Sequence, residues 1–99
     1  MDFLELTDRF EKNIKQNFEI ELLELHYIPY SFGSGTKAYR INGRNIKIIF
    51  DGRDGLLETL ISGHHEKYSS SNWTTTFNGT ATDFVDKEIE KIKVKLKSV

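Results

Sequence analysis

Apolar and polar residues alternate with different periods along the chain, and these periods predict its secondary structure. Near the N-terminus, apolar residues recur every three or four positions, which predicts an amphipathic helix over about residues 3–18: Phe3, Leu6, Phe10, Ile14 and Phe18. Asp2 and Glu5 have the spacing of a capping pair at its start. A second helix, capped by Thr80 or Thr82, is predicted near the C-terminus from a similar stripe: Val85, Ile89, Ile92 and Leu96, with Phe84 alongside.

Between the two helices, the pattern changes to that of β-strands. The segment IELLELHYIPY is rich in apolar and aromatic residues, and it predicts a strand over about residues 20–28. We expect the strand to end near Pro29, because proline lacks the backbone donor that a central ladder position needs. Leu22 and Leu23 break the alternation, which indicates either a bulge or burial on both faces.

The dipeptide Asn42-Gly43, between KAYRI and RNIKIIFD, predicts a tight hairpin because both residues tolerate positive φ angles. The alternation in the second strand places Ile46, Ile48 and Phe50 on a core-facing side. The following DGRDG is a connector. LLETLIS, residues 56–62, fits a strand or a helix, and we favour a strand because NWTTTF, another strand-like run, follows after the loop HHEKYSSS.

The order of these elements defines the fold class. We expect one α+β domain over residues 1–99, with a mainly antiparallel sheet of four to five strands around a central hairpin. Short turns between consecutive strands favour this antiparallel sheet. We expect the N-terminal and C-terminal helices to flank it and to pack on one of its faces.

Composition narrows the possible functions. The chain has 99 residues, no cysteine and a net charge of -1, so thiol chemistry is excluded and general affinity for nucleic acid is not expected. The N-terminus has no secretory signal and no segment has the length of a membrane span, so we expect a cytoplasmic protein without a membrane partner. The acidic-to-basic gradient along the last helix matches the helix dipole.

The segment SFGSGTKAYR combines two glycines with aromatic and cationic residues. It lacks the full spacing of a phosphate-binding loop and leads into a strand, so we interpret it as a glycine-rich connection whose aromatic and basic side chains suit contact with a protein. The predicted contact residues are Tyr30, Phe32, Lys37, Tyr39, Arg40 and Arg53, with His64 and His65 on a second loop.

His64, His65 and Glu66 also raise the question of a metal or catalytic site. Adjacent strand residues point to opposite faces, so only His64 and Glu66 could converge, and His26 would have to supply a third ligand. No serine or carboxylate motif accompanies a histidine, and we predict neither catalytic residues nor a metal or cofactor. Trp73, the only tryptophan, is expected in the core, although it could instead cap an exposed sheet surface.

In its size, its helix and strand order and its lack of an active-site motif, the chain resembles small bacterial immunity proteins, the antitoxin-like partners of contact-dependent and other polymorphic toxins. The resemblance implies direct binding to a cognate toxin domain; the near-neutral charge does not favour a nuclease as that toxin. Two alternatives are an RNA-binding module, with Tyr39 stacking on bases beside Arg40, Arg44 and Lys47, and a small enzyme centred on His64 or His65. The sequence does not define the oligomeric state.

Overall fold

The computed structural model describes residues 2–98, and its elements follow the predicted order. The elements are α1 (Phe3–Ile14), β1 (Ile20–Ile28), β2 (Ser34–Ile41), β3 (Arg44–Asp51), β4 (Leu56–His64), the short 3-10 helix η1 (Tyr68–Ser70), β5 (Thr74–Thr80), a second 3-10 helix η2 (Ala81–Asp83) and α2 (Asp86–Lys97). Segment 56–62 is therefore a strand, as expected. No helix within residues 2–98 has the length and apolar character that crossing a membrane requires.

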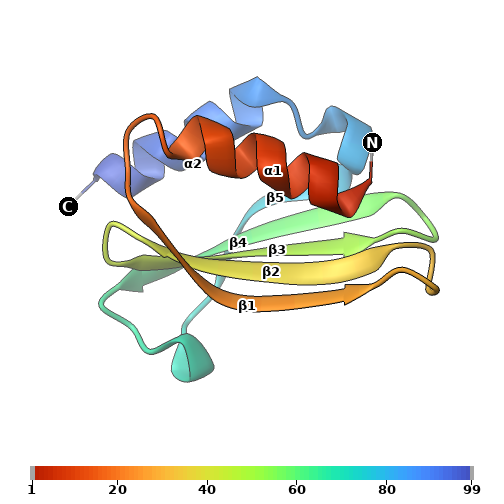
Figure 1. Ribbon diagram of the computed structural model, residues 1–99. Helices are drawn as coiled ribbons and strands as arrows, with labels where there is room; N and C mark the ends of the chain where they lie inside the picture. The colour runs from red at the N-terminus through yellow and green to blue at the C-terminus, as the bar shows by residue number, and fades with distance from the viewer. Residues whose placement is uncertain (1, 99) are drawn as a thin grey trace.

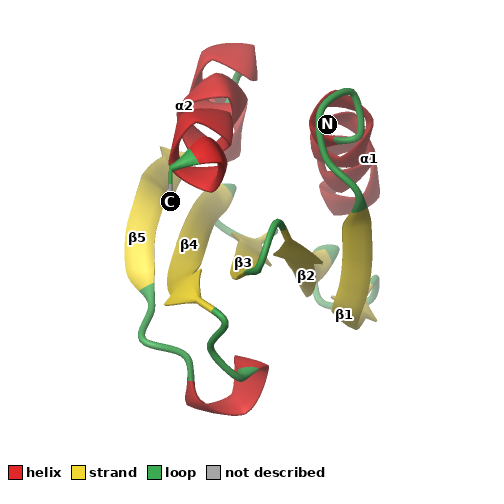
Figure 2. Ribbon diagram, turned by 90° about the vertical axis from the view of Figure 1, so that its left-hand side faces the viewer, coloured by secondary structure: helices red, strands yellow, loops and turns green. Residues whose placement is uncertain are grey.

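The five strands form one antiparallel sheet in the order β1-β2-β3-β4-β5. Each strand pairs with its neighbour in sequence, so the sheet is a simple meander. Both helices lie on one face of this sheet, while the loop that contains η1 lies on the other (Figure 1; Figure 2). This arrangement confirms the α+β class and the placement of both helices on one face. We refer to the two sides as the covered face and the open face.

The central hairpin and the bulge both occur where the sequence indicated them. Asn42 and Gly43 have φ angles of 51° and 81°, the left-handed values that a type I′ turn requires. In β1, the register with β2 shifts between Leu22 and Glu24, so the paired leucines mark a bulge.

The two helices differ from the prediction at their ends. Asp2 caps α1 by accepting a hydrogen bond from the Glu5 backbone nitrogen at 2.8 Å, as expected. The helix ends at Ile14 rather than near residue 18, because the chain turns there so that Phe18 packs against the core from outside the helix. The N-cap of α2 is Val85, not Thr80 or Thr82; the Thr80 hydroxyl instead donates to Asp83 at 2.8 Å.

The hydrophobic core fills the space between the helices and the covered face. It contains the predicted stripes of both helices except Val85, which is exposed, and Phe18, which packs against it from outside. Alternate residues of β2, β3 and β4 complete it. Phe3 stacks on Tyr27 and on Phe50, with ring centroids 6.1 and 6.0 Å away. Gly35 permits this packing because a Cβ there would come within 2.7 Å of the Phe3 ring.

Candidate protein-binding surface

The β1–β2 and β3–β4 turns lie side by side at one end of the sheet, which we call the turn end (Figure 1). A side chain at Gly52 would collide with the carbonyl oxygen of Phe32, so the two turns are in direct backbone contact. The Gly52 nitrogen also donates to the Ser34 hydroxyl at 3.0 Å. These contacts hold the backbone of the first turn against the second.

Tyr30 and Phe32 are the most exposed aromatic residues described, with 91% and 69% of their surfaces accessible. Neither contributes to the core. Phe32 has a φ angle of 57°, in the left-handed region that bulky side chains rarely adopt. The turn is held by hydrogen bonds from Ser31 to the Ile28 oxygen and from Gly33 to the Pro29 oxygen. Of the predicted contact residues, Tyr30, Phe32 and the exposed Arg53 therefore come together at the turn end.

Lys37 and Tyr39, by contrast, do not belong to a contact surface, and this part of the prediction is wrong. Both face α1, where the Lys37 ammonium lies 2.6 Å from a carboxylate oxygen of Glu11 and the Tyr39 hydroxyl donates to the same oxygen at 2.6 Å. Tyr39 is only 1% exposed. Burial raises the pKa of Tyr39 far above its ordinary value, and the hydrogen bond to Glu11 and the charge of that carboxylate raise it further.

The segment SFGSGTKAYR is mostly a strand, not a loop. β2 begins at Ser34, so only Ser31, Phe32 and Gly33 belong to the turn. Within the strand, Arg40 points to the open face, where its guanidinium donates to the Asn45 side chain at 3.1 Å and to the Glu66 backbone oxygen at 3.3 Å. Arg40 is exposed, but it lies far along the strand from the turn end, beside the central hairpin.

His64 and His65 lie at the opposite end of the sheet, next to that hairpin, so they do not join the turn-end residues. Arg44 donates to Nε2 of His64 at 3.0 Å, while the His65 backbone nitrogen donates to the Gly43 oxygen at 2.7 Å. Asn42 donates to the Leu96 oxygen, which ties the hairpin to the end of α2. Within residues 2–98, no group of three or more histidine, aspartate or glutamate side chains could hold a metal ion.

Trp73 covers part of the open face, so the expectation of a core position was wrong. Lys47 lies beneath it, with its ammonium 4.8 Å from the Trp73 ring centroid and 5.1 Å from that of Tyr68. The two rings meet edge to face at 5.9 Å. Partial burial raises the pKa of Tyr68 to about 12, and the neighbouring Glu24 carboxylate adds to the rise. We call Lys47, Tyr68 and Trp73 the aromatic latch.

The aromatic latch explains why Ala38 is buried on the open face. Ala38 pairs with Glu24 on one side and Lys47 on the other, on the face that no helix covers, and it is nevertheless fully buried. Asn45 anchors the same loop by donating to the Glu66 oxygen at 3.0 Å and to the Ser71 hydroxyl at 2.9 Å. One sign of this arrangement is present in the sequence, because the alternation that places Ile46 and Ile48 on the core-facing side of β3 puts Lys47 on its other side.

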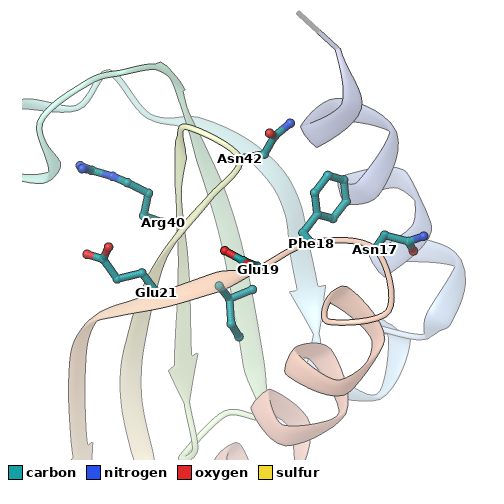
Figure 3. Close-up of a pocket in the computed structure, with 7 residues that line it drawn as sticks. Asn17, Phe18, Glu19, Glu21, Arg40 and Asn42 are labelled. Atoms are coloured by element: carbon teal, nitrogen blue, oxygen red, sulfur yellow. The ribbon is translucent and has the colours of Figure 1, made fainter.

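A shallow depression of about 460 Å³ lies near the start of β1. Its lining residues come from the α1–β1 connection, β1 and β2, and from the central hairpin: Asn17, Phe18, Glu19, Ile20, Glu21, Arg40 and Asn42. In Figure 3, the Arg40 and Glu21 side chains extend on one side, while Phe18 turns toward α2. No histidine lines this depression, so it does not provide the pocket that the histidine-centred enzyme hypothesis requires.

Comparison with protein-family models, with curated proteins and with solved structures finds no significant match to this chain. The functional argument therefore rests on the chemistry of the described residues. The turn end presents exposed aromatic side chains and a cation on a backbone held by hydrogen bonds, which is the composition of a protein-binding surface. The RNA-binding hypothesis loses its stacking residue, because Tyr39 faces the core.

Proposed function

We propose that this protein is a protein-binding module that neutralises a cognate bacterial toxin domain in the manner of an immunity protein, and that the turn end is its contact surface. The observation that carries the proposal is Phe32. The residue is 69% exposed and its backbone is left-handed, so neither burial nor conformational preference accounts for a phenylalanine at this position. Such strained, exposed positions are concentrated at ligand-binding sites.

The surroundings of Phe32 support the proposal. Tyr30 lies two residues away and is 91% exposed, and Arg53 extends from the adjoining turn. Tyrosine and arginine dominate the energetic centres of protein interfaces, since they combine a large contact area with directional polar groups. Because hydrogen bonds already hold the turn, little conformational entropy is lost when a partner covers it. Neutralisation by such a surface requires only that the bound protein obstruct the active site of the toxin.

The test begins with co-expression of the chain and the product of the adjacent gene, followed by affinity purification and titration calorimetry. Replacing Tyr30 by alanine or Phe32 by glycine should each weaken the complex by about 2 kcal/mol, or roughly 30-fold. Phe32→Gly should change the free energy of unfolding by less than about 1 kcal/mol, because glycine tolerates the left-handed backbone. The variants should also lose protection against the activity of the partner.

Val94→Ala provides a matched control. Val94 lies on α2 and is 68% exposed, nearly the same fraction as Phe32, but α2 lies over the covered face. This substitution should leave binding unchanged. A tight complex that tolerates the changes at Tyr30 and Phe32 would overturn the assignment of the surface, and the absence of any complex or neutralising activity would overturn the proposed function.

A further inference from the structure

β1 is an edge strand of nine residues, and its outer side has no neighbouring strand. Figure 2 shows it at one margin of the sheet, below α1. The unpaired backbone N–H and C=O groups of such a strand can pair with another extended segment, over about 30 Å in a strand of this length. Natural sheets usually carry features that prevent pairing at such edges, so the side chains on this edge decide whether it can accept a further strand.

The side chains of β1 are suited to contact. Leu22 and Leu25 are 52% and 51% exposed, although they pair with Tyr39 and Lys37 on the covered face. Their outer surfaces extend beyond the edge of the core. Leu4 on α1 is a further exposed leucine, with 41% of its surface accessible. The opposite edge strand, β5, instead begins with exposed threonines.

Charge distinguishes the two edges more strongly. Residues 16–36 contain three glutamates and no lysine or arginine, whereas β5 contains no charged residue. These glutamates are Glu19, Glu21 and Glu24. Within residues 2–98, none of them takes part in a salt bridge. The nearest basic residues across the β1–β2 ladder are already engaged, because Lys37 is paired with Glu11 and Arg40 is bonded to Asn45.

We propose that β1 receives an extended basic segment of the protein partner as an added strand. This inference rests on the proposed function and names the element of the partner that the chain would bind. Lysine or arginine side chains of the added strand would face the glutamates, and its apolar residues would cover Leu22 and Leu25. A second copy of this chain fits the edge less well, since it would place its own three glutamates against the same three.

The bulge limits where the added strand can pair. The β1–β2 register is regular over residues 20–22 and, beyond the shift between Leu22 and Glu24, over the longer run 24–28. The chain then continues directly into the turn that carries Tyr30 and Phe32. A segment bound along this part of β1 would therefore extend toward the turn end, so the edge and the aromatic turn would form one continuous surface.

The edge can be probed without the natural partner. The probe is a ten-residue peptide of alternating lysine and valine, compared with a peptide in which glutamate replaces every lysine. Amide hydrogen exchange and ¹H–¹⁵N shifts of the intact chain should show protection and shifts in residues 20–28 with the basic peptide only, and the effect should weaken as salt increases. Equal effects of both peptides, protection at residues 74–80 instead, or no protection at millimolar peptide would overturn the inference.

Lysine substitutions on the two edges separate edge binding from general charge effects. Leu25→Lys should weaken binding of the basic peptide and of the captured partner by about tenfold, because an edge lysine opposes strand addition and repels a basic strand. Thr74→Lys, on the exposed edge strand β5, should leave both affinities unchanged. A partner complex sensitive to Phe32→Gly but not to Leu25→Lys would overturn the edge inference alone. Failure to capture any partner would count against the proposed function. The peptide experiment alone would then decide whether β1 accepts a basic strand.

Discussion

Each face of the sheet holds one lysine on adjacent strands, and the two lysines have different surroundings. On the covered face, the Lys37 side chain is 13% exposed; it pairs with Glu11 at 2.6 Å and donates to the Thr7 hydroxyl at 3.2 Å. On the open face, Lys47 lies against the rings of Tyr68 and Trp73. One cation is held by a carboxylate beneath a helix, and the other by aromatic rings beneath a loop.

The different surroundings of Lys37 and Lys47 indicate which face of the sheet tolerates substitutions without loss of the fold. A buried charge that loses its partner retains its desolvation cost, so the covered face requires Glu11 as well as its apolar residues. A cation over an exposed ring gains only about 0.5–1 kcal/mol, so the aromatic latch contributes less. We therefore expect substitutions on the covered face to destabilise the protein, whereas those on the open face and the turn end should mainly alter local structure and binding.

The largest expected effect is in the core. Phe10 is fully buried and its ring lies 5.6 Å from that of Tyr39, so Phe10→Ala should lower the free energy of unfolding by about 3–5 kcal/mol. Ile49→Ala, on the open face, should cost less than about 1 kcal/mol because Ile49 is already 36% exposed. Urea denaturation followed by circular dichroism measures both. Similar losses in the two variants would contradict the contrast between the faces.

A smaller loss is expected from the buried ion pair. Glu11→Gln should reduce the free energy of unfolding by about 2 kcal/mol, since it leaves the Lys37 ammonium and the Tyr39 hydroxyl without their shared carboxylate. Asp8→Asn is the control, because it removes the exposed pair between Asp8 and Lys12 on the same helix and should cost less than about 0.5 kcal/mol. Equal costs in urea denaturation would mean that burial does not strengthen the Glu11 interaction.

Local patterns in the sequence were sufficient for most of the fold. The strand over residues 20–28 and the Asn42-Gly43 hairpin depend on neighbouring residues, and both were predicted where they occur. The bulge after Leu22 was one of two alternatives that the paired leucines indicated. The end of α1 was predicted wrongly, because Phe18 continues the helical spacing even though the chain has already left the helix. Spacing records which side chains reach the core, but it does not record the backbone path that brings them there.

The candidate site was harder to predict because aromatic and basic residues occur in both interfaces and cores. Lys37 and Tyr39 were grouped with exposed residues by composition, although the alternation from Lys37 through Tyr39 to Ile41 already places all three on one face of a strand. Trp73 was misplaced for another reason. The sequence does not show that the β4–β5 loop folds across the open face, which depends on contacts with Asn45 and Lys47 on β3.

The smallest expected effect on stability concerns the aromatic latch, where Trp73→Ala should cost about 1 kcal/mol. The same substitution should lower the pKa of Tyr68 from about 12 toward 10.0, because removing the indole hydrates the phenol and favours its ionised form. A raised tyrosine pKa supports stability below pH 10 that is lost as the pH rises toward 12, since the unfolded chain releases its proton first. Between pH 10 and pH 12, the free energy of unfolding should therefore fall less in Trp73→Ala than in the unsubstituted protein.

Tyrosine ¹³Cζ shifts measured against pH would follow the ionisation of Tyr68 directly, and urea denaturation at pH 9 and pH 11 would follow its effect on stability. Thr75→Ala is a suitable control, because Thr75 is exposed on β5 and lies outside the aromatic latch. If the pKa of Tyr68 were unchanged in Trp73→Ala, the Glu24 carboxylate rather than burial beside the indole would be the main cause of its rise. The β4–β5 loop would then be held on the open face chiefly by the hydrogen bonds of Asn45, and not by the edge-to-face contact between Tyr68 and Trp73.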